Sequence, residues 1–138
     1  MIVIVSICLG WYVDHFYRFQ REILGTWHYS HGGYRTTLTI RPDKSFEKTQ
    51  RWRTHGRTFE GTYEPYDGGV VFSILNQTDF EHTQNGPNVT SEKRLNETVP
   101  CRLAICNNGY LLIHSLGSKA VAQELRLNWE SYKPANAR

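Results

Sequence analysis

Six histidines are the side chains of this chain best suited to metal binding or proton transfer, and two of them, His28 and His31, form an H-x-x-H pair. On a strand, positions three apart point to opposite faces of the sheet. The two rings therefore share a metal ion only if the chain bends near Gly32-Gly33. We predict surface histidines, no metal site and no cofactor.

Catalytic motifs are missing from the sequence. It contains no G-x-S-x-G, no H-E-x-x-H, no phosphate-binding loop and no dinucleotide fingerprint. Asp79 and Glu81 beside His82 are the best acid–base candidates, and they lie in a polar stretch at 76–98 that we expect to be an irregular loop. A hydrolase with its site in that loop is one alternative, but we expect a loop charge cluster and no enzymatic activity.

Cys101 and Cys106 are the two cysteines that follow this stretch, and Cys8 lies near the N-terminus. If 101–106 is a straight strand, the Cα atoms of the pair are roughly 16 Å apart. A disulfide needs Cα atoms within about 7 Å. The strand interpretation therefore predicts two thiols.

Arginines and aromatic residues alternate in the middle of the chain, so their positions depend on strand register. Phe46 and Trp52 share a core face and need core-face partners. This requirement places Ile40 opposite Phe46, and it places Trp52 opposite both Tyr34 and Phe59.

The same register puts charged side chains on the outer face, with Arg51 opposite Arg35 on one neighbouring strand and opposite Glu60 on the other. Like charges facing each other are unfavourable. The resulting basic patch consists of Arg35, Arg41, Arg51, Arg53 and Arg57. Such a patch is either a solvated, salt-bridged sheet face or a site for an acidic partner, an anion or lipid headgroups.

Binding of an anionic polymer or nucleic acid by this patch is a second alternative function. Stacking on single-stranded nucleic acid needs aromatic rings beside the arginines. Trp52 and Phe59 lie on the face opposite Arg51 and Arg53, and the net charge of +3 is mild. We therefore do not expect nucleic acid as the partner.

The elements that carry these residues are strands. The 138 residues, 39% of them hydrophobic, suffice for one domain. Two-residue alternation and turn signals predict strands at 34–41, 46–53, 57–64, 70–75, 101–106, 110–116 and 123–132. The fold class is therefore all-β, an antiparallel up-and-down meander of about eight strands forming a small barrel or sandwich, preceded by one N-terminal helix.

Three segments carry a family resemblance: Gly25-Thr26-Trp27, the hairpin from Thr37 to Phe46, and Phe59-Glu60-Gly61-Thr62-Tyr63. Together they resemble the small lipocalin-like (calycin-type) β-barrels over roughly residues 23–75. The resemblance implies an antiparallel barrel that holds a small apolar ligand, with Trp27 closing its floor. It also implies an arginine packed on that tryptophan; Arg126 is the candidate, although alternation puts it outside the core.

Lys48 and Gln50 fall on the core face between Phe46 and Trp52. A buried lysine in a dry core is costly. The sheet therefore opens there, or Lys48 extends its ammonium to water, or a polar cavity exists. The cavity that we expect is lined by Trp27, Leu38, Lys48, Gln50, Trp52, Phe59 and Tyr63.

Residues 1–13 carry no charge and are followed by Arg18 and Arg21. As a helix they span about 20 Å of the roughly 30 Å hydrocarbon layer. The segment resembles the short single-pass anchors of small bacterial membrane proteins; the alternative is a buried core helix or strand. We expect an anchor at 1–20 in contact with membrane lipid, a binding domain at 23–132 and a flexible tail at 133–138. The anchor resemblance places the domain outside the cytoplasm, whereas the basic residues after the anchor favour the cytoplasm.

Overall fold

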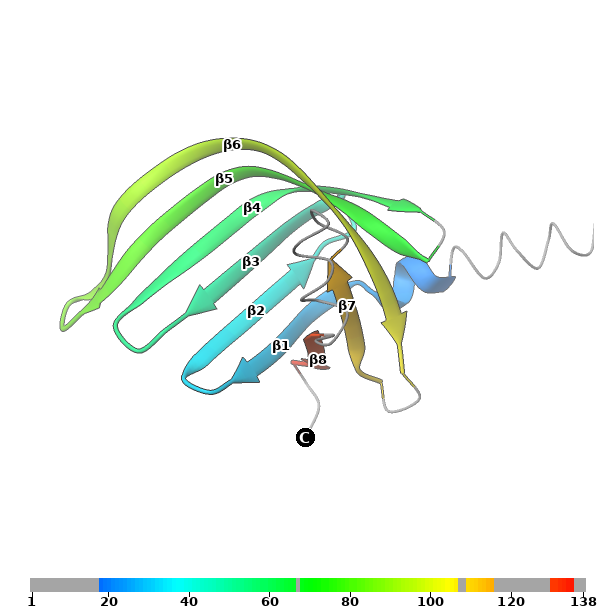
Figure 1. The fold of residues 1–138 in the computed structure, drawn as a ribbon, viewed down its shortest axis with the longest axis horizontal. Helices are drawn as coiled ribbons and strands as arrows, with labels where there is room; N and C mark the ends of the chain where they lie inside the picture. The colour runs from blue at the N-terminus through cyan, green and yellow to red at the C-terminus, as the bar shows by residue number, and fades with distance from the viewer. Residues whose placement is uncertain (1–17, 67, 107–108, 116–129, 136–138) are drawn as a thin grey trace, which may run out of the picture.

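A computed structural model describes residues 18–66, 68–106, 109–115 and 130–135, and strands of one antiparallel sheet dominate this part of the chain (Figure 1). The strands are β1 (Gly25–His31), β2 (Tyr34–Ile40), β3 (Ser45–Arg51), β4 (His55–Tyr66), β5 (Gly69–Thr83), β6 (Gly86–Ile105), β7 (Leu111–Ser115) and β8 (Glu130–Pro134). The prediction of an all-β antiparallel meander of about eight strands is confirmed.

Each strand pairs with the next one along the chain, and the last pairs with the first. Trp27 lies opposite Pro134 and His28 opposite Lys133, so the hydrogen-bonded order closes on itself. In Figure 1, β1 to β6 form one strongly curved sheet, and β7 and β8 cross in front of it. The buried side chains gather on the inner side of this curve.

The β2–β3 hairpin agrees with the prediction made from the sequence. Thr36, Leu38 and Ile40 are buried and alternate with more exposed neighbours. The amide of Lys44 donates to the Arg41 carbonyl at 3.3 Å, and Lys44 has a φ of 69°. This is a tight turn followed by one left-handed residue, a common hairpin connection. The predicted pairing of Ile40 with Phe46 is confirmed.

The β3–β4 register differs from the prediction by four residues. Phe59 lies opposite Lys48 instead of Trp52, and Arg51 lies opposite Gly56 instead of Glu60. The cause is the position of the turn: the amide of Trp52 already donates to the carbonyl of His55 at 2.8 Å, so β4 begins two residues early. Because four is an even number, the shift leaves Phe59 on the inner face and Glu60 on the outer face, as predicted.

The polar stretch at 76–98 is not a loop, so that prediction was wrong. It comprises the end of β5, a tight turn and most of β6, with Thr83 paired to Gly86. Most of its side chains are exposed, so its strands show no alternation of apolar and polar residues. In Figure 1 these strands form an arm that extends beyond β1 to β3.

The two ends of the chain are described only in part. Residues 18–22 are helical, and among the described residues no helix is long and apolar enough to cross a membrane. Most of the expected anchor, including Cys8, and Arg126 with most of the strand expected at 123–132 lie outside the described residues. At the C-terminus, Lys133 and Pro134 belong to β8 and pair with β1, where a tail was expected.

Gly61 sits at an irregularity in the β4–β5 pairing, opposite both Phe46 and Ile74. A Cβ atom there would collide with the backbone carbonyl oxygen of Ser73 and lie 3.1 Å from the Phe46 ring. We predict that Gly61→Ala lowers the free energy of unfolding by about 2 kcal/mol, because the strands must separate. Urea denaturation measures this. Gly33→Ala is the matched control, since nothing lies within 4 Å of its Cβ position; an equal effect of both would contradict the prediction.

Lys44 is the one non-glycine residue with a positive φ in the described chain. Its ammonium lies 5.6 Å from the centre of the Tyr63 ring. We predict that Lys44→Gly is more stable than Lys44→Ala by about 1 kcal/mol, because both lack the ammonium and only glycine adopts this backbone conformation without cost. Thermal and urea denaturation of the pair test it. A more stable alanine variant would show that the turn is unstrained.

Candidate functional site

An apolar cavity of about 170 Å³ lies on the inner side of the sheet. Side chains from seven of the eight strands form its wall, since alternate residues of each strand point inward. They are Leu38, Phe46, Lys48, Phe59, Phe72, Ile74, Val99, Cys101, Ile113 and Tyr132. The curvature of the sheet thus gathers residues from both ends of the domain around one volume.

The core beside the cavity is aromatic. The rings of Phe46 and Phe72 are 4.7 Å apart, close to edge-to-face. Tyr63 is buried and its hydroxyl donates to the Arg41 carbonyl at 2.7 Å, and burial raises the pKa of that hydroxyl. Trp27 is 6% exposed and its indole N–H donates to the Ile23 carbonyl at 3.0 Å. Trp27 therefore ties the chain that enters β1 to the core.

Lys48 brings a cation to this apolar wall. It lies on β3 between Leu38 of β2 and Phe59 of β4, both of which also line the cavity. The Lys48 side chain is half-buried. A flexible four-carbon stem can lie along apolar neighbours while the ammonium reaches a polar group. Lys48 therefore adds both an apolar stem and a charge to this part of the sheet.

Polar and aromatic side chains follow on the same face, one and two steps farther along the strands. The Gln50 amide donates to the Tyr34 hydroxyl at 3.0 Å. The Tyr34 and Trp52 rings are 5.7 Å apart, and Trp52 stacks on His55 at 5.1 Å. These four residues form a rim beside the apolar cavity.

An ion pair extends this rim onto β4 and β5. Arg57 Nε donates to Asp79 Oδ1 at 2.7 Å and Nη2 to Oδ2 at 3.3 Å, which is a two-point contact. The Gln77 amide also donates to Asp79 Oδ1, at 3.3 Å. The hydrogen bond from Arg57 is the main cause that lowers the pKa of the Asp79 carboxyl.

The seven residues expected to line a cavity fall into three groups. Leu38, Lys48 and Phe59 do line it. Gln50 and Trp52 lie at the rim, and Trp27 and Tyr63 belong to the adjoining core. The sequence analysis missed most of the opposite wall, chiefly Phe72, Ile74 and Val99. Phe72 and Ile74 alternate with Ser73 on β5, but this alternation is hidden within the largely apolar run Val70 to Leu75, and Val99 follows the polar stretch 76–98 on β6.

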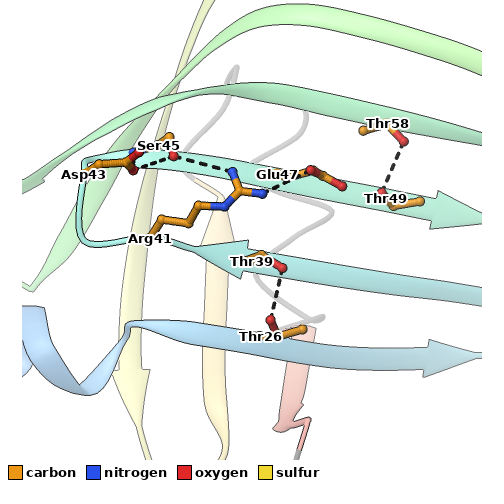
Figure 2. A network of polar contacts seen from close by, with 8 residues as sticks. All are labelled: Thr26, Thr39, Arg41, Asp43, Ser45, Glu47, Thr49 and Thr58. Carbon is orange, nitrogen blue, oxygen red and sulfur yellow. Dashed lines mark hydrogen bonds and ion pairs between the residues drawn. The ribbon is translucent and has the colours of Figure 1, made fainter.

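The predicted basic patch is divided by the structure. Arg57 shares the inner face with Phe59, where it pairs with Asp79, so its assignment to the patch was wrong. Arg41 pairs with Glu47 at 3.2 Å and reaches Ser45, as Figure 2 shows. On that outer face, Thr26 bonds Thr39 and Thr49 bonds Thr58, each at 3.2 Å. Arg35 and Arg51 remain, paired opposite each other as predicted, with Arg53 exposed in the turn after β3.

Groups that bind metals or perform catalysis are sparse. Within the part of the chain that the structure describes, no three His, Cys, Asp or Glu side chains converge as a metal site. His28 Nδ1 lies 3.1 Å from the Thr37 hydroxyl on the outer face, and the side chain of His31 lies outside the description. Cys101 is buried in β6, and Cys106 follows the end of that strand; both are thiols.

Comparisons with known proteins identify no relative of this chain. No protein-family model, no curated protein and no solved structure matches the chain.

The Arg57–Asp79 pair makes stability depend on pH. Because the pKa of Asp79 is lowered in the folded state, the pair stabilises the fold above the ordinary value of 3.8, and this contribution fades as pH falls toward the lowered pKa. We predict that Asp79→Asn lowers the free energy of unfolding at pH 7 by less than about 1 kcal/mol, since both side chains are partly exposed. The deficit should shrink at pH 3. Urea denaturation at both pH values tests this, with exposed Glu64→Gln as the control; a deficit equal at both values would contradict it.

Proposed function

We propose that this chain is a membrane-tethered, non-catalytic binding module of the lipocalin-like type, which holds a small apolar or amphipathic molecule in its inner cavity. The observation that carries the proposal is the apolar cavity of about 170 Å³ with Lys48 in its wall. The tether follows from the uncharged run at 1–13 and the barrel type from the motifs between Gly25 and Tyr63.

The size of the cavity limits the ligand. A protein cavity of about 150 Å³ lined by aliphatic and aromatic residues takes up one benzene-sized molecule, and sites for drug-sized ligands start at about 300 Å³. The inferred ligand is therefore no larger than one substituted ring or a short acyl chain. Burial of its apolar surface against Phe46, Phe72 and Ile74 supplies the binding free energy.

Lys48 gives the ligand a preferred polarity. A carboxylate at the end of a short acyl chain would place its tail against the aromatic wall and its charge beside the ammonium. A charge-assisted hydrogen bond in a partly dry site is stronger than a neutral one. We therefore propose that an acidic head is favoured over a neutral one of the same length.

Hydrolysis is the weaker alternative. It depended on an irregular loop at 76–98, and those residues form paired strands instead. Asp79, its central acid, is held by Arg57 and Gln77.

The cavity can be tested by titrating the full chain with hexanoate, hexanol and hexylamine while recording tryptophan fluorescence. We predict that Val99→Phe, which fills the cavity, weakens hexanoate and hexanol binding at least tenfold. Thr62→Phe, on the exposed outer face opposite Ser45, should bind as the unmodified chain does. Equal binding by the two variants would refute the cavity as the site.

The role of Lys48 has its own test. Lys48→Met keeps the length of the apolar stem and removes the charge. We predict that hexanoate then binds no better than hexanol, while hexanol binding changes by less than twofold. If hexanoate retains its advantage, the acidic head is recognised elsewhere.

A further inference from the structure

Two arginines face each other across neighbouring strands on the outer side of the sheet. Arg35 of β2 lies directly opposite Arg51 of β3, and both side chains are exposed. Residues directly opposite in an antiparallel pair have Cβ atoms about 5 Å apart, and like charges at such positions are destabilising. The repulsion between the two guanidinium groups therefore destabilises this pair of strands.

No acid on the described strands relieves this cost. The other cross-strand neighbours are Ser30 for Arg35 and Gly56 for Arg51. Glu60, the acid that the predicted register placed opposite Arg51, lies opposite Glu47 instead. Neither Arg35 nor Arg51 forms an ion pair with any residue that the structure describes.

Glu47 is the nearest acid along β3, and it is already engaged. It is four residues from Arg51, and its carboxylate accepts from Arg41 Nη2 at 3.2 Å (Figure 2). The charge of Glu47 is thus neutralised at the far end of the hairpin. The end that carries Arg35 and Arg51 keeps an excess of two positive charges.

The surface around the two arginines is hollowed and polar. A groove of about 630 Å³ runs over β1, β2 and β3, and Ser30, Arg35, Thr37 and Arg51 line it. Glu47 also lines this groove, and its carboxylate is paired with Arg41. The Thr37 hydroxyl and the His28 ring are within hydrogen-bond distance of each other at 3.1 Å. Two guanidinium forks and several hydroxyl groups therefore border one concave surface.

We propose that this groove is a binding site for a tetrahedral dianionic oxyanion, a phosphate group, held between Arg35 and Arg51. A guanidinium presents donors in a planar fork that matches two oxygens of a phosphate. One phosphate bridging both forks turns the repulsion between them into two attractions. The hydroxyls of Ser30 and Thr37 supply neutral donors at the edge.

The phosphate has two possible sources, a free anion or the phosphomonoester headgroup of a lipid. Both use the same two arginines. They differ in whether the groove must meet a membrane surface, where negative surface potential attracts basic side chains. Inorganic phosphate and vesicles of phosphatidylcholine with and without phosphatidic acid separate the two sources.

The first test measures inorganic phosphate binding to the full chain by calorimetry at constant ionic strength. We expect Arg35→Gln and Arg51→Gln each to weaken binding at least tenfold. The control is Arg94→Gln, an exposed arginine on β6 that lies opposite Asn76, and it should stay within twofold. Equal affinity in all three variants would overturn the proposal, and no binding by the unmodified chain would exclude the free anion as the source.

Thermal unfolding provides a second readout that a structural role for these arginines would not give. Phosphate stabilises many proteins weakly by being excluded from their surface, and the Arg35→Gln variant, which lacks one arginine of the site, reports this background. Without phosphate, Arg35→Gln should unfold at the same or a higher temperature than the unmodified chain, since repulsion is removed. With phosphate, the unmodified chain should gain more than the variant does. A variant that is less stable without phosphate and gains equally with it would show that Arg35 is merely structural.

Binding to vesicles shows whether the phosphate group comes from a lipid headgroup or from a free anion. Retention on phosphatidic acid vesicles that is lost in Arg35→Gln and Arg51→Gln supports the lipid headgroup. Binding of inorganic phosphate without such retention supports the free anion. Failure of both overturns the site, and it leaves the inner cavity untouched because that cavity lies on the opposite face of the sheet.

Discussion

The pairing of β8 with β1 is the contact on which the rest of the described structure depends. It is short, with only Trp27 and His28 opposite Pro134 and Lys133, and the Ala135 amide extends it by donating to the Thr26 carbonyl at 2.9 Å. Yet it connects strands from the two ends of the domain. It brings the fully buried Tyr132 into the core and holds β7 in place across the mouth of the curved sheet. Without it, the sheet is open between β1 and β8.

The inner face of the closed sheet has an apolar part and a polar part. The part near Phe46 and Phe72 is apolar, and these two aromatic rings pack edge to face. The part near Gln50 and Asp79 is bonded side chain to side chain. Lys48 lies between the two. The inner face therefore changes from polar to apolar along the strands, with Lys48 at the change.

The sequence could predict those parts of the fold where a local signal and a buried face agree. Pro42 and Asp43 fix the β2–β3 turn, so the pairing of Ile40 with Phe46 followed. The turn after β3 has no such signal, because Arg53 and Thr54 have no strong turn preference. The strands predicted at 46–53 and 57–64 therefore placed this turn too close to Gly56. The arm at 76–98 has no buried face for most of its length, so alternation could not reveal it. Only part of the cavity wall could be predicted. On β2, β3 and β4 the inward residues alternate with outward ones in the sequence, whereas on β5 they lie within a largely apolar run that hides the alternation.

The unequal length of the strands has a consequence for the association of this chain with itself. β6 has 20 residues, but β7 pairs only with Cys101 to Ile105, so most of one edge of β6 meets no described strand. Open edges of this kind recruit strands from other molecules and start aggregates. Pro87 interrupts the row of amide donors, and Glu92, Lys93 and Arg94 are all exposed along the same segment. A mixed row of charges makes a second strand costly to add, which protects the molecule where its sheet is least covered.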